Sequence, residues 1–417
     1  MTNAAFMLPD SLMDPDFAFD GAVELQAARP AALIAPLSSA FDLAESQSPG
    51  HGVRVAHVAL AVAETLGLKN ADRRTVFYAS LLHDSGVAVA ELPPEVDPNG
   101  GHAAAGGWVA ARLGLDERIQ NTILASHERW DGAGRPQGTA GGEIPLEALI
   151  VNAAHWAIEI AENPESPLKA RASLLRVHPR DIAPMVGSEV AEATTDALHG
   201  DSMWTGLWDN DLAALLAGGV SGDGRASVKN VERIAAALGD VTDASVREAG
   251  RSARVADLAM QLARRMGIAK SERRAIGVAG RLLDIGQMGI PRFITEKPSI
   301  LSLEEMELMR HHPGMAARIL EATPGMDEIS MWVSAHHERP DGRGYPEMLQ
   351  GYEIPLAARI LAVADSYWAL RADRPHREAF SHAEAREILE AGADEHYDAD
   401  VVMMLETSLG AAAEAAG

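Results

Sequence analysis

The chain has 417 residues, a length that favours two or three domains. Apolar residues make up 47% and charged residues 23%, a balance typical of globular proteins that argues against global disorder or a membrane bundle. Lys and Arg total 36 against 60 Asp and Glu, and a formal charge of −24 disfavours binding of a nucleic-acid backbone by charge. The absence of Cys excludes disulfides, zinc fingers and thiol catalysis, so a metal site must use His and carboxylate ligands.

The start of the chain does not have the composition of a targeting signal. The first 20 residues carry four Asp and no Lys or Arg, the opposite of a secretory signal. No apolar stretch reaches the roughly 18–20 residues needed to cross a bilayer. We therefore expect a cytoplasmic protein without a membrane segment, with residues 1–30 as an accessory arm.

Periodicity predicts helices in chain order. Apolar residues recur at helical spacing from Val55 to Leu66, and Gly67 follows where a helix would stop. Further helices are predicted over 72–86, 116–127 and 149–159, and strand-like alternation is scarce. The sequence thus predicts an all-α protein made of two bundles of about six or seven helices each.

An internal repeat divides the chain. Residues 127–136 match 337–346 at an offset of 210, and residues 82–86 match 282–286 at an offset of 200. The second copy therefore holds about ten extra residues, in the stretch 288–310. A repeat of this length predicts tandem domains. Glycine-rich turns near 200 and 218–224 mark the boundary, with a short helix over 203–217. The predicted parts are an arm (1–30), a first domain (31–202), a linker (203–224) and a second domain (225–417).

Histidines in the first copy fall at the ends or inner faces of the predicted helices. With one aspartate they form a set of six residues: His51, His83, Asp84, His102, His127 and His155. Imidazole and carboxylate suit divalent Fe, Mn or Zn, and one carboxylate can bridge two ions. Two ions can hold a phosphate and activate a bound water. Any single histidine is more often a hydrogen-bonded core residue, but the clustering favours a metal site.

The order of these residues resembles the HD-GYP group of the HD phosphohydrolase superfamily. The resemblance rests on His51, then His83-Asp84, His102, and the run from His127 through Asp131-Gly to Ile144-Pro-Leu. It implies two helical HD domains, metal-dependent hydrolysis of cyclic dinucleotides such as cyclic di-GMP, and two ions in the first copy. By the resemblance, one ion is held by His51, His83, Asp84 and His155, and the other by Asp84, His102 and His127.

The first copy departs from the family pattern at four positions. Ser126 replaces one of a histidine pair, Val87 replaces a lysine, Arg135 replaces the tyrosine of Gly-Tyr-Pro, and His155 stands where the family has Asp. We expect a weaker second ion. Asp84 would take part in catalysis, and Arg129 or Arg135 would contact a phosphate oxygen.

The second copy has lost different residues. Arg251 and Leu283 occupy the positions of His51 and His83, and Gln287 takes the lysine position. Arg brings a permanent positive charge to the site. A single metal on the remaining residues is one interpretation: Asp284, His312, His336 and His337. The other is a polar cluster that Arg251 neutralises through Asp284 or Asp365.

The leading functional hypothesis is a metal-dependent phosphodiesterase with catalysis in the first copy, acting on a cyclic dinucleotide or another phosphate ester. The second copy would be regulatory, form a homodimer or dock a signalling protein. One alternative is a non-catalytic protein that binds a nucleotide or a protein; another is an HD-type di-iron oxygenase. Several tryptophans, including Trp108, are assigned to packing, whereas Trp130 beside His127 is a candidate to line a base pocket.

Overall fold

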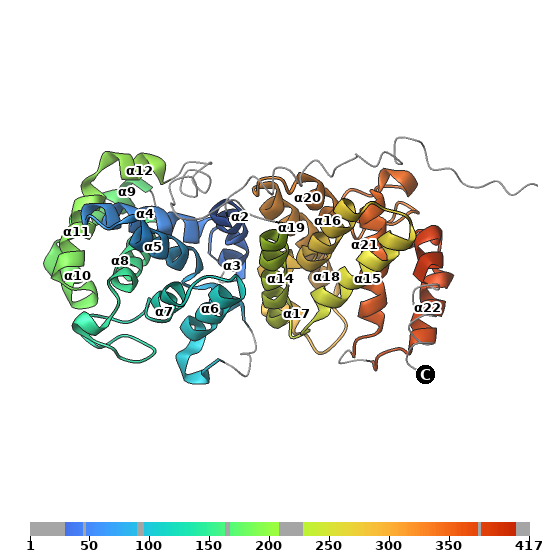
Figure 1. Ribbon diagram of the computed structural model, residues 1–417, viewed down its shortest axis with the longest axis horizontal. Helices are drawn as coiled ribbons and strands as arrows, with labels where there is room; N and C mark the ends of the chain where they lie inside the picture. The colour runs from blue at the N-terminus through green and yellow to red at the C-terminus, as the bar shows by residue number, and fades with distance from the viewer. Residues whose placement is uncertain are drawn as a thin grey trace, which may run out of the picture.

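The computed structural model describes residues 30–44, 47–89, 96–162, 167–207, 228–373 and 377–405. Within these ranges the chain is helical, and β-pairing is limited to two isolated bridges. The predicted all-α class is confirmed. Two helical bundles lie side by side along the long axis of the molecule (Figure 1).

The first bundle carries two short helices ahead of its main helices. In chain order its helices are α2 (Pro30–Leu37), α3 (Ser39–Ala44), α4 (His51–Thr65), α5 (Asn70–Leu82), η2 (Ser85–Ala88), η3 (Pro98–Gly100), α6 (Gly101–Arg112), α7 (Glu117–Leu124), η4 (Gly141–Glu143), α8 (Leu146–Ala161), α9 (Pro167–Leu174), α10 (Pro179–Val186), α11 (Ser188–His199) and α12 (Asp201–Gly206).

The second bundle repeats the central order of the first. Its helices are α14 (Val228–Ser245), α15 (Arg251–Arg265), α16 (Lys270–Leu282), η5 (Ile285–Gly289), α17 (Arg292–Thr295), α18 (Leu303–Met309), α19 (His312–Glu321), α20 (Asp327–Ser334), η6 (Gly351–Glu353), α21 (Leu356–Leu370) and α22 (His382–Ala391). The extra residues predicted over 288–310 contain α17 and α18. The predicted arm and most of the predicted linker lie outside the described residues, as does the 203–217 helix beyond the end of α12.

Helix α4 shows why the chain folds as it does around the site. Val55, Val58 and Val62 are fully buried along one face, as their spacing predicts. Gly50 precedes the helix with a φ of 85°, a left-handed conformation that favours glycine. The buried Asp42 accepts the amide protons of Gly50 (2.7 Å) and Gly52 (3.1 Å), which satisfies donors left open at the helix start.

The two bundles pack through reciprocal contacts of their leading helices. Helices α2 and α3 of the first bundle pack on α19 and η5 of the second, and α14 packs on α6 and η2. Figure 1 shows α2, α3 and α14 at the junction of the bundles. One hydrophobic core spans both copies and contains Leu33 and Phe41 as well as Val231 and Ile234. Arg292 of α17 also donates a hydrogen bond of 2.6 Å to the carbonyl of Val87, three residues after Asp84.

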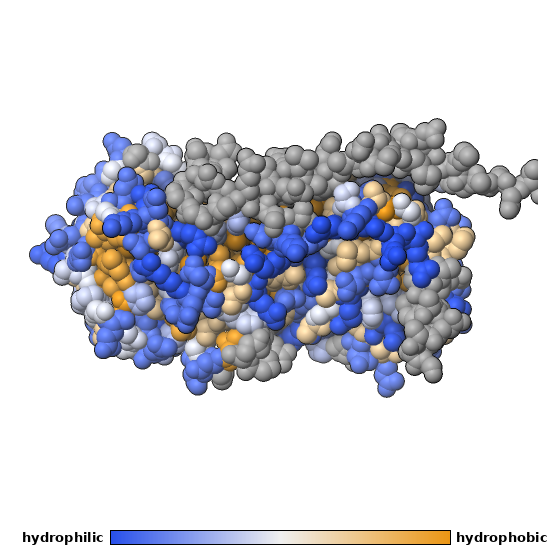
Figure 2. All heavy atoms as spheres, in the orientation of Figure 1, coloured by the Kyte–Doolittle hydropathy of each residue, from blue (hydrophilic) through white to orange (hydrophobic). Residues whose placement is uncertain are grey.

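Hydrophilic residues cover much of the face shown in Figure 2, with a hydrophobic area at the end formed by α10 and α11. Among the described helices, none combines the length and apolar character required to cross a membrane.

Candidate metal centre

The centre of the site is the His83-Asp84 pair at the end of α5. His83 Nδ1 donates to the carbonyl of Ser80 (2.9 Å), which fixes the ring and turns Nε2 toward Asp84 Oδ2 (2.8 Å). Both residues are buried. A ring held in this way through its outer nitrogen presents the other nitrogen's lone pair to a ligand.

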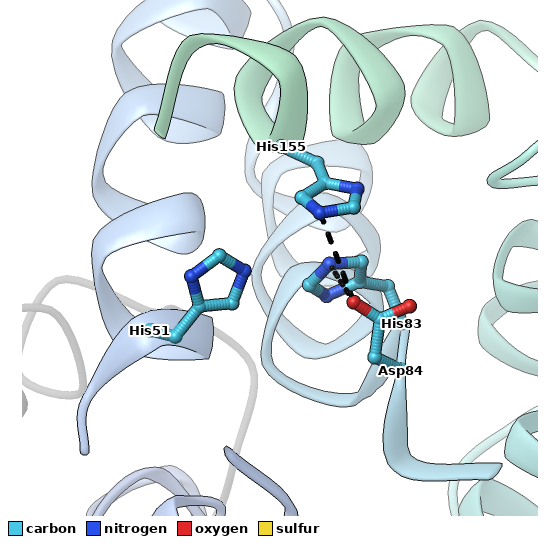
Figure 3. Close-up of side chains that lie close together, drawn as sticks. All are labelled: His51, His83, Asp84 and His155. Carbon is cyan, nitrogen blue, oxygen red and sulfur yellow. Dashed lines mark ion pairs between the residues drawn. The ribbon is translucent and has the colours of Figure 1, made fainter. Parts of the chain in front are cut away.

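Two histidines from other helices face this pair (Figure 3). His51 is the first residue of α4, and His155 projects from α8 with Nε2 3.9 Å from Asp84 Oδ2. The His155 ring lies 4.6 Å from that of His83 and 5.5 Å from that of His51, measured between centroids. The ligand atoms of His51, His83, Asp84 and His155 all lie within 4.8 Å of one another.

A second group lies on the other oxygen of Asp84. Asp84 Oδ1 is 3.2 Å from His127 Nε2 and 4.0 Å from His102 Nε2. His102 is the second residue of α6 and its side chain is 45% exposed, so the centre opens to solvent on this side. The ligand atoms of these three residues also lie within 4.8 Å of one another. Asp84 is therefore shared by two candidate sites, an arrangement suited to bridging two ions.

Close packing of η2 against α6 brings the two groups together. A Cβ on Gly86 would lie 1.9 Å from the carbonyl oxygen of His102 and 2.5 Å from the amide nitrogen of Gly106. Only glycine permits this approach between the turn after Asp84 and the start of α6. The glycine two residues after the aspartate is thus a geometric requirement of the site.

Three residues of the cluster have pKa values shifted in the direction that favours metal binding. Burial alone would raise the pKa of Asp84, but the nearby charge of His83 and a hydrogen bond with His127 lower it well below its usual range. Burial lowers the pKa of His155 to about 3, and burial and His127 lower that of His102. A carboxylate binds a divalent ion in its ionised form and an imidazole in its neutral form, and the shifts of Asp84, His102 and His155 favour these forms. His51 Nε2 is buried and has no hydrogen-bond partner among the described residues, as expected of a nitrogen that faces an ion.

The structure brings together all six residues predicted for the first copy, although α7 ends at Leu124 and leaves His127 in the following turn rather than on the helix. The two arginines predicted to contact a phosphate, Arg129 and Arg135, differ in whether the guanidinium is already paired and in exposure. Arg129 forms a two-pronged ion pair with Asp131 (3.0 and 2.6 Å). Arg135 is exposed on the loop that follows His127.

The remaining first-copy expectations concern Ser126 and Trp130. The buried hydroxyl of Ser126 donates to the carbonyl of Ile123 (2.8 Å). The second group therefore offers three candidate ligands among the described residues. Trp130 is 41% exposed and packs on Gly187, where a Cβ would lie 2.8 Å from the indole. Its indole thus anchors the loop after His127 to the turn between α10 and α11.

Sequence reasoning missed Glu162, which lies one residue beyond α8. Its Oε2 accepts from His51 Nδ1 (2.8 Å), and its Oε1 accepts from Arg54 Nε (2.6 Å). Burial opposes ionisation of Glu162, but the hydrogen bond with His51 lowers its pKa below the usual value. Glu162 follows His155 by seven residues, or two helical turns, and that spacing is the signal that could have revealed it.

The second copy has the same framework with a different centre. Arg251, at the position of His51, forms an ion pair with Asp284 and a second with Asp365 (2.6 Å). Burial alone would lower the pKa of Arg251, but the charges of Asp284 and Asp365 raise it above its usual value, so the guanidinium stays charged. The sequence predicted a contact with one aspartate or the other, and the structure shows both. Ala372 stands at the position of Glu162, so the ligand and its supporting carboxylate are both missing here.

Three histidines remain close together in the second copy. The ligand atoms of His312, His336 and His337 lie within 4.8 Å of one another. Asp284 Oδ1 is 3.4 Å from His312 Nε2, while its other oxygen is taken by Arg251. Burial lowers the pKa of His312 to about 4. The predicted second-copy ligands therefore lie together, but beside a guanidinium that occupies part of the site.

Comparison with known proteins identifies both copies as HD domains. The HD domain family matches residues 50–156 and, through a second HD model, residues 241–401. The 3′3′-cGAMP-specific phosphodiesterase 3 of Vibrio cholerae is 25% identical over 436 residues, covering 90% of this chain and 94% of that protein. A cyclic di-GMP phosphodiesterase of Thermotoga maritima is 38% identical over 151 residues, covering 36% of this chain and 41% of that protein.

A solved structure shares the fold. The crystal structure of a cyclic GMP-AMP-specific phosphodiesterase of V. cholerae (V-cGAP3) superposes with a TM-score of 0.67 at 22% identity, covering 92% of this chain and 98% of that one. Fold and site together define a tandem HD-domain protein. The chain belongs to the HD domain family, with two HD copies.

Proposed function

We propose that the protein is a metal-dependent phosphodiesterase that hydrolyses cyclic dinucleotides in its first copy, while its second copy is non-catalytic. The observation that carries the proposal is the position of Asp84, whose two oxygens face two separate groups of histidines. The names of the relatives support the substrate class, because those proteins are phosphodiesterases of 3′3′-cGAMP or cyclic di-GMP.

The residues present fit a pair of divalent ions. His51, His83, Asp84 and His155 would hold one ion, and Asp84, His102 and His127 the other. Bound ions of this kind polarise a phosphodiester and lower the pKa of a water to near neutrality. The protein contributes orientation: Ser80 and Glu162 fix the rings of His83 and His51, and the exposed side of His102 admits the substrate.

Arg135 is the better candidate for a phosphate contact. Its exposed guanidinium stands on the same loop as His127, whereas that of Arg129 is already paired with Asp131. A guanidinium can donate two parallel hydrogen bonds to a phosphate. In this arrangement Arg135 would partly replace the lysine that the family carries at the position of Val87.

The test compares one histidine variant in each copy, His83→Ala in the first and His312→Ala in the second. Protein loaded with manganese or iron is analysed for metal content and for hydrolysis of cyclic di-GMP, 3′3′-cGAMP and a generic diester. We expect His83→Ala to lose metal and activity and His312→Ala to retain activity. Equal metal and equal activity in His83→Ala and the unchanged protein would refute the proposal. A rate that depends on oxygen would instead indicate di-iron oxidation.

A non-catalytic nucleotide sensor is the second candidate. Ser126 favours it, because its hydroxyl bonds within its own turn and leaves the second group with three protein ligands. This function predicts nucleotide binding that survives His83→Ala and needs no added metal. Turnover by the metal-loaded protein would rule it out.

A further inference from the structure

The start of α4 determines where His51 lies, and a carboxylate from another helix holds that start. His51 is the first residue of α4, and its two neighbours, Gly50 and Gly52, both donate their amide protons to Asp42 of α3. Asp42 Oδ2 accepts from Gly50 (2.7 Å) and Oδ1 accepts from Gly52 (3.1 Å). The backbone on both sides of His51 is therefore fixed to a single buried side chain.

The same attachment sets the position of His51 relative to His83. A Cβ on Gly52 would lie 3.0 Å from the carbonyl oxygen of Leu81, two residues before His83, so the start of α4 packs directly on the end of α5. His51 and His83 belong to the same candidate ligand group. Metal ligands must lie within about 0.2 Å of their preferred distances. A small displacement of the start of α4 would therefore weaken the site.

Helix α3, which carries Asp42, rests on the second copy. It packs on η5 at the junction of the bundles (Figure 1). Leu43, the residue after Asp42, lies against Gly289 of η5, where a Cβ would be 3.3 Å from Leu43 Cδ1. Because η5 directly follows Asp284, this contact begins at the centre of the second copy. A chain of contacts thus leads from η5 through Leu43 and Asp42 to His51.

A related contact in the second copy holds a residue that is not a metal ligand. Asp243 of α14 accepts the amide proton of Ser252 (3.1 Å to each oxygen) and its hydroxyl proton (3.0 Å). Ser252 follows Arg251 at the start of α15, as Gly52 follows His51. Both copies therefore hold the start of the corresponding helix with a buried aspartate from the preceding helix. Only in the first copy does that helix begin with a candidate ligand.

We infer that Asp42 positions His51 for the first ion, and that the second copy holds Asp42 in place through the contact of Leu43 with η5. This inference rests on the proposed function, in which His51 is a metal ligand. It gives the non-catalytic copy a task at the metal centre of the first. When either contact is disturbed, the start of α4 moves, and His51 changes its position relative to both His83 and Glu162.

The first arm of the test compares Asp42→Asn with Asp243→Asn in the full chain. Asparagine keeps the size of the side chain, but its NH₂ group would face one of the two amide donors, Gly50 or Gly52. Asp243→Asn disturbs the matching contact at Ser252 and is the control for a loss of stability alone.

The second arm compares Gly289→Ala with Gly277→Ala, both in the second copy. A Cβ on Gly289 would lie against Leu43 and 2.9 Å from Met315 Sδ. A Cβ on Gly277 would lie 2.7 Å from Met260 Sδ, between α15 and α16 and not against α3. Both substitutions thus press on a methionine, but only Gly289→Ala also presses on α3.

Two measurements report on His51. The first is the affinity of the first copy for manganese or iron, taken as the part of metal binding that His83→Ala removes, in a competition titration with a chelating dye. The second is the proton NMR signal of His51 Nδ1 in metal-free protein, which the carboxylate of Glu162 shifts downfield and which His51→Gln identifies by its loss. Melting curves measure stability in every variant.

We expect Asp42→Asn to weaken first-copy metal binding by about 10-fold or more and to shift or broaden the His51 signal. Gly289→Ala should change both in the same direction by a smaller factor. Asp243→Asn and Gly277→Ala should lower the melting temperature and change neither. Equal results for Asp42→Asn and Asp243→Asn would overturn the role of Asp42, and equal results for the two glycine variants would overturn the role of the second copy. If His83→Ala removes no metal, the proposed function fails, while the His51 signal still decides whether Asp42 and η5 position that ring.

Discussion

The hydrogen bond between Glu162 and His51 gives the sharpest test of how the first ion is held. Glu162→Gln keeps the size of the side chain but removes its charge. One carboxylate oxygen now lies 2.8 Å from His51 Nδ1 and the other 2.6 Å from Arg54 Nε. An amide can accept from only one of these donors, because its NH₂ group would face the other. His51 thus loses either its orientation or the negative charge that makes its Nε2 a better ligand.

Loss of such a supporting contact weakens metal binding by about 10- to 100-fold, or about 1.4 to 2.7 kcal/mol. The assay is a competition titration with a chelating dye, using manganese or iron and metal-free protein. Glu64→Gln on the same helix is the control, because the side chain of Glu64 is 75% exposed and 3.9 Å from Arg73. If Glu162→Gln binds metal as tightly as Glu64→Gln, His51 is not a ligand held by this carboxylate.

Three further predictions follow from packing and charge. Gly86→Ala places a methyl group against the carbonyl of His102, so it should destabilise the fold by about 1–3 kcal/mol and reduce metal content. The control Gly286→Ala, with a Cβ 2.0 Å from the carbonyl of His312, should destabilise the fold but leave the metal content of the first copy unchanged. Melting curves and elemental analysis check both variants, and normal metal content in Gly86→Ala would contradict the packing argument. Arg251→Met removes the ion-pair partner of Asp284 and Asp365 and should lower the free energy of unfolding by roughly 3–5 kcal/mol. The control Arg265→Met, at an exposed position, should change it little. Urea titration measures the difference, and equal losses would show that Arg251 does not stabilise the cluster. Burial lowers the pKa of folded His155 to about 3, against 6.5 for an ordinary histidine, so between these pH values the unfolded metal-free chain binds more protons than the folded one. The free energy of unfolding should therefore fall as the pH drops below 6.5, by at most about 1.4 kcal/mol per pH unit from this residue. His155→Gln should flatten that dependence in urea titrations from pH 7 to 5, and an unchanged slope would contradict the prediction.

The candidate ligands could be read from the sequence because their signals are local. Helix periodicity placed His51, His83 and His102 near helix ends, and the repeat aligned the two copies residue by residue. Arg251 was recognisable as a cation at a ligand position for the same reason. Short-range patterns of this kind survive without knowledge of the tertiary structure.

The rest of the site depends on contacts between distant segments. Glu162 contacts His51 across 111 residues. The two-turn spacing places Glu162 on the same side as His155, but no local pattern shows that His51 lies against it. Periodicity identified the buried faces of helices but could not say which helix covers them, so the packing of α14 on α6 and η2 was not predicted.

The reciprocal packing of the leading helices at the junction of the bundles has a consequence for how the two halves can diverge. Two identical subunits joined through such contacts would carry every substitution twice, and a change that removed a ligand from one would remove it from the other. Here both partners of the interface belong to one polypeptide. One half can therefore carry Arg251 in place of a histidine and keep supporting its neighbour, while that neighbour retains the residues of both candidate ligand groups.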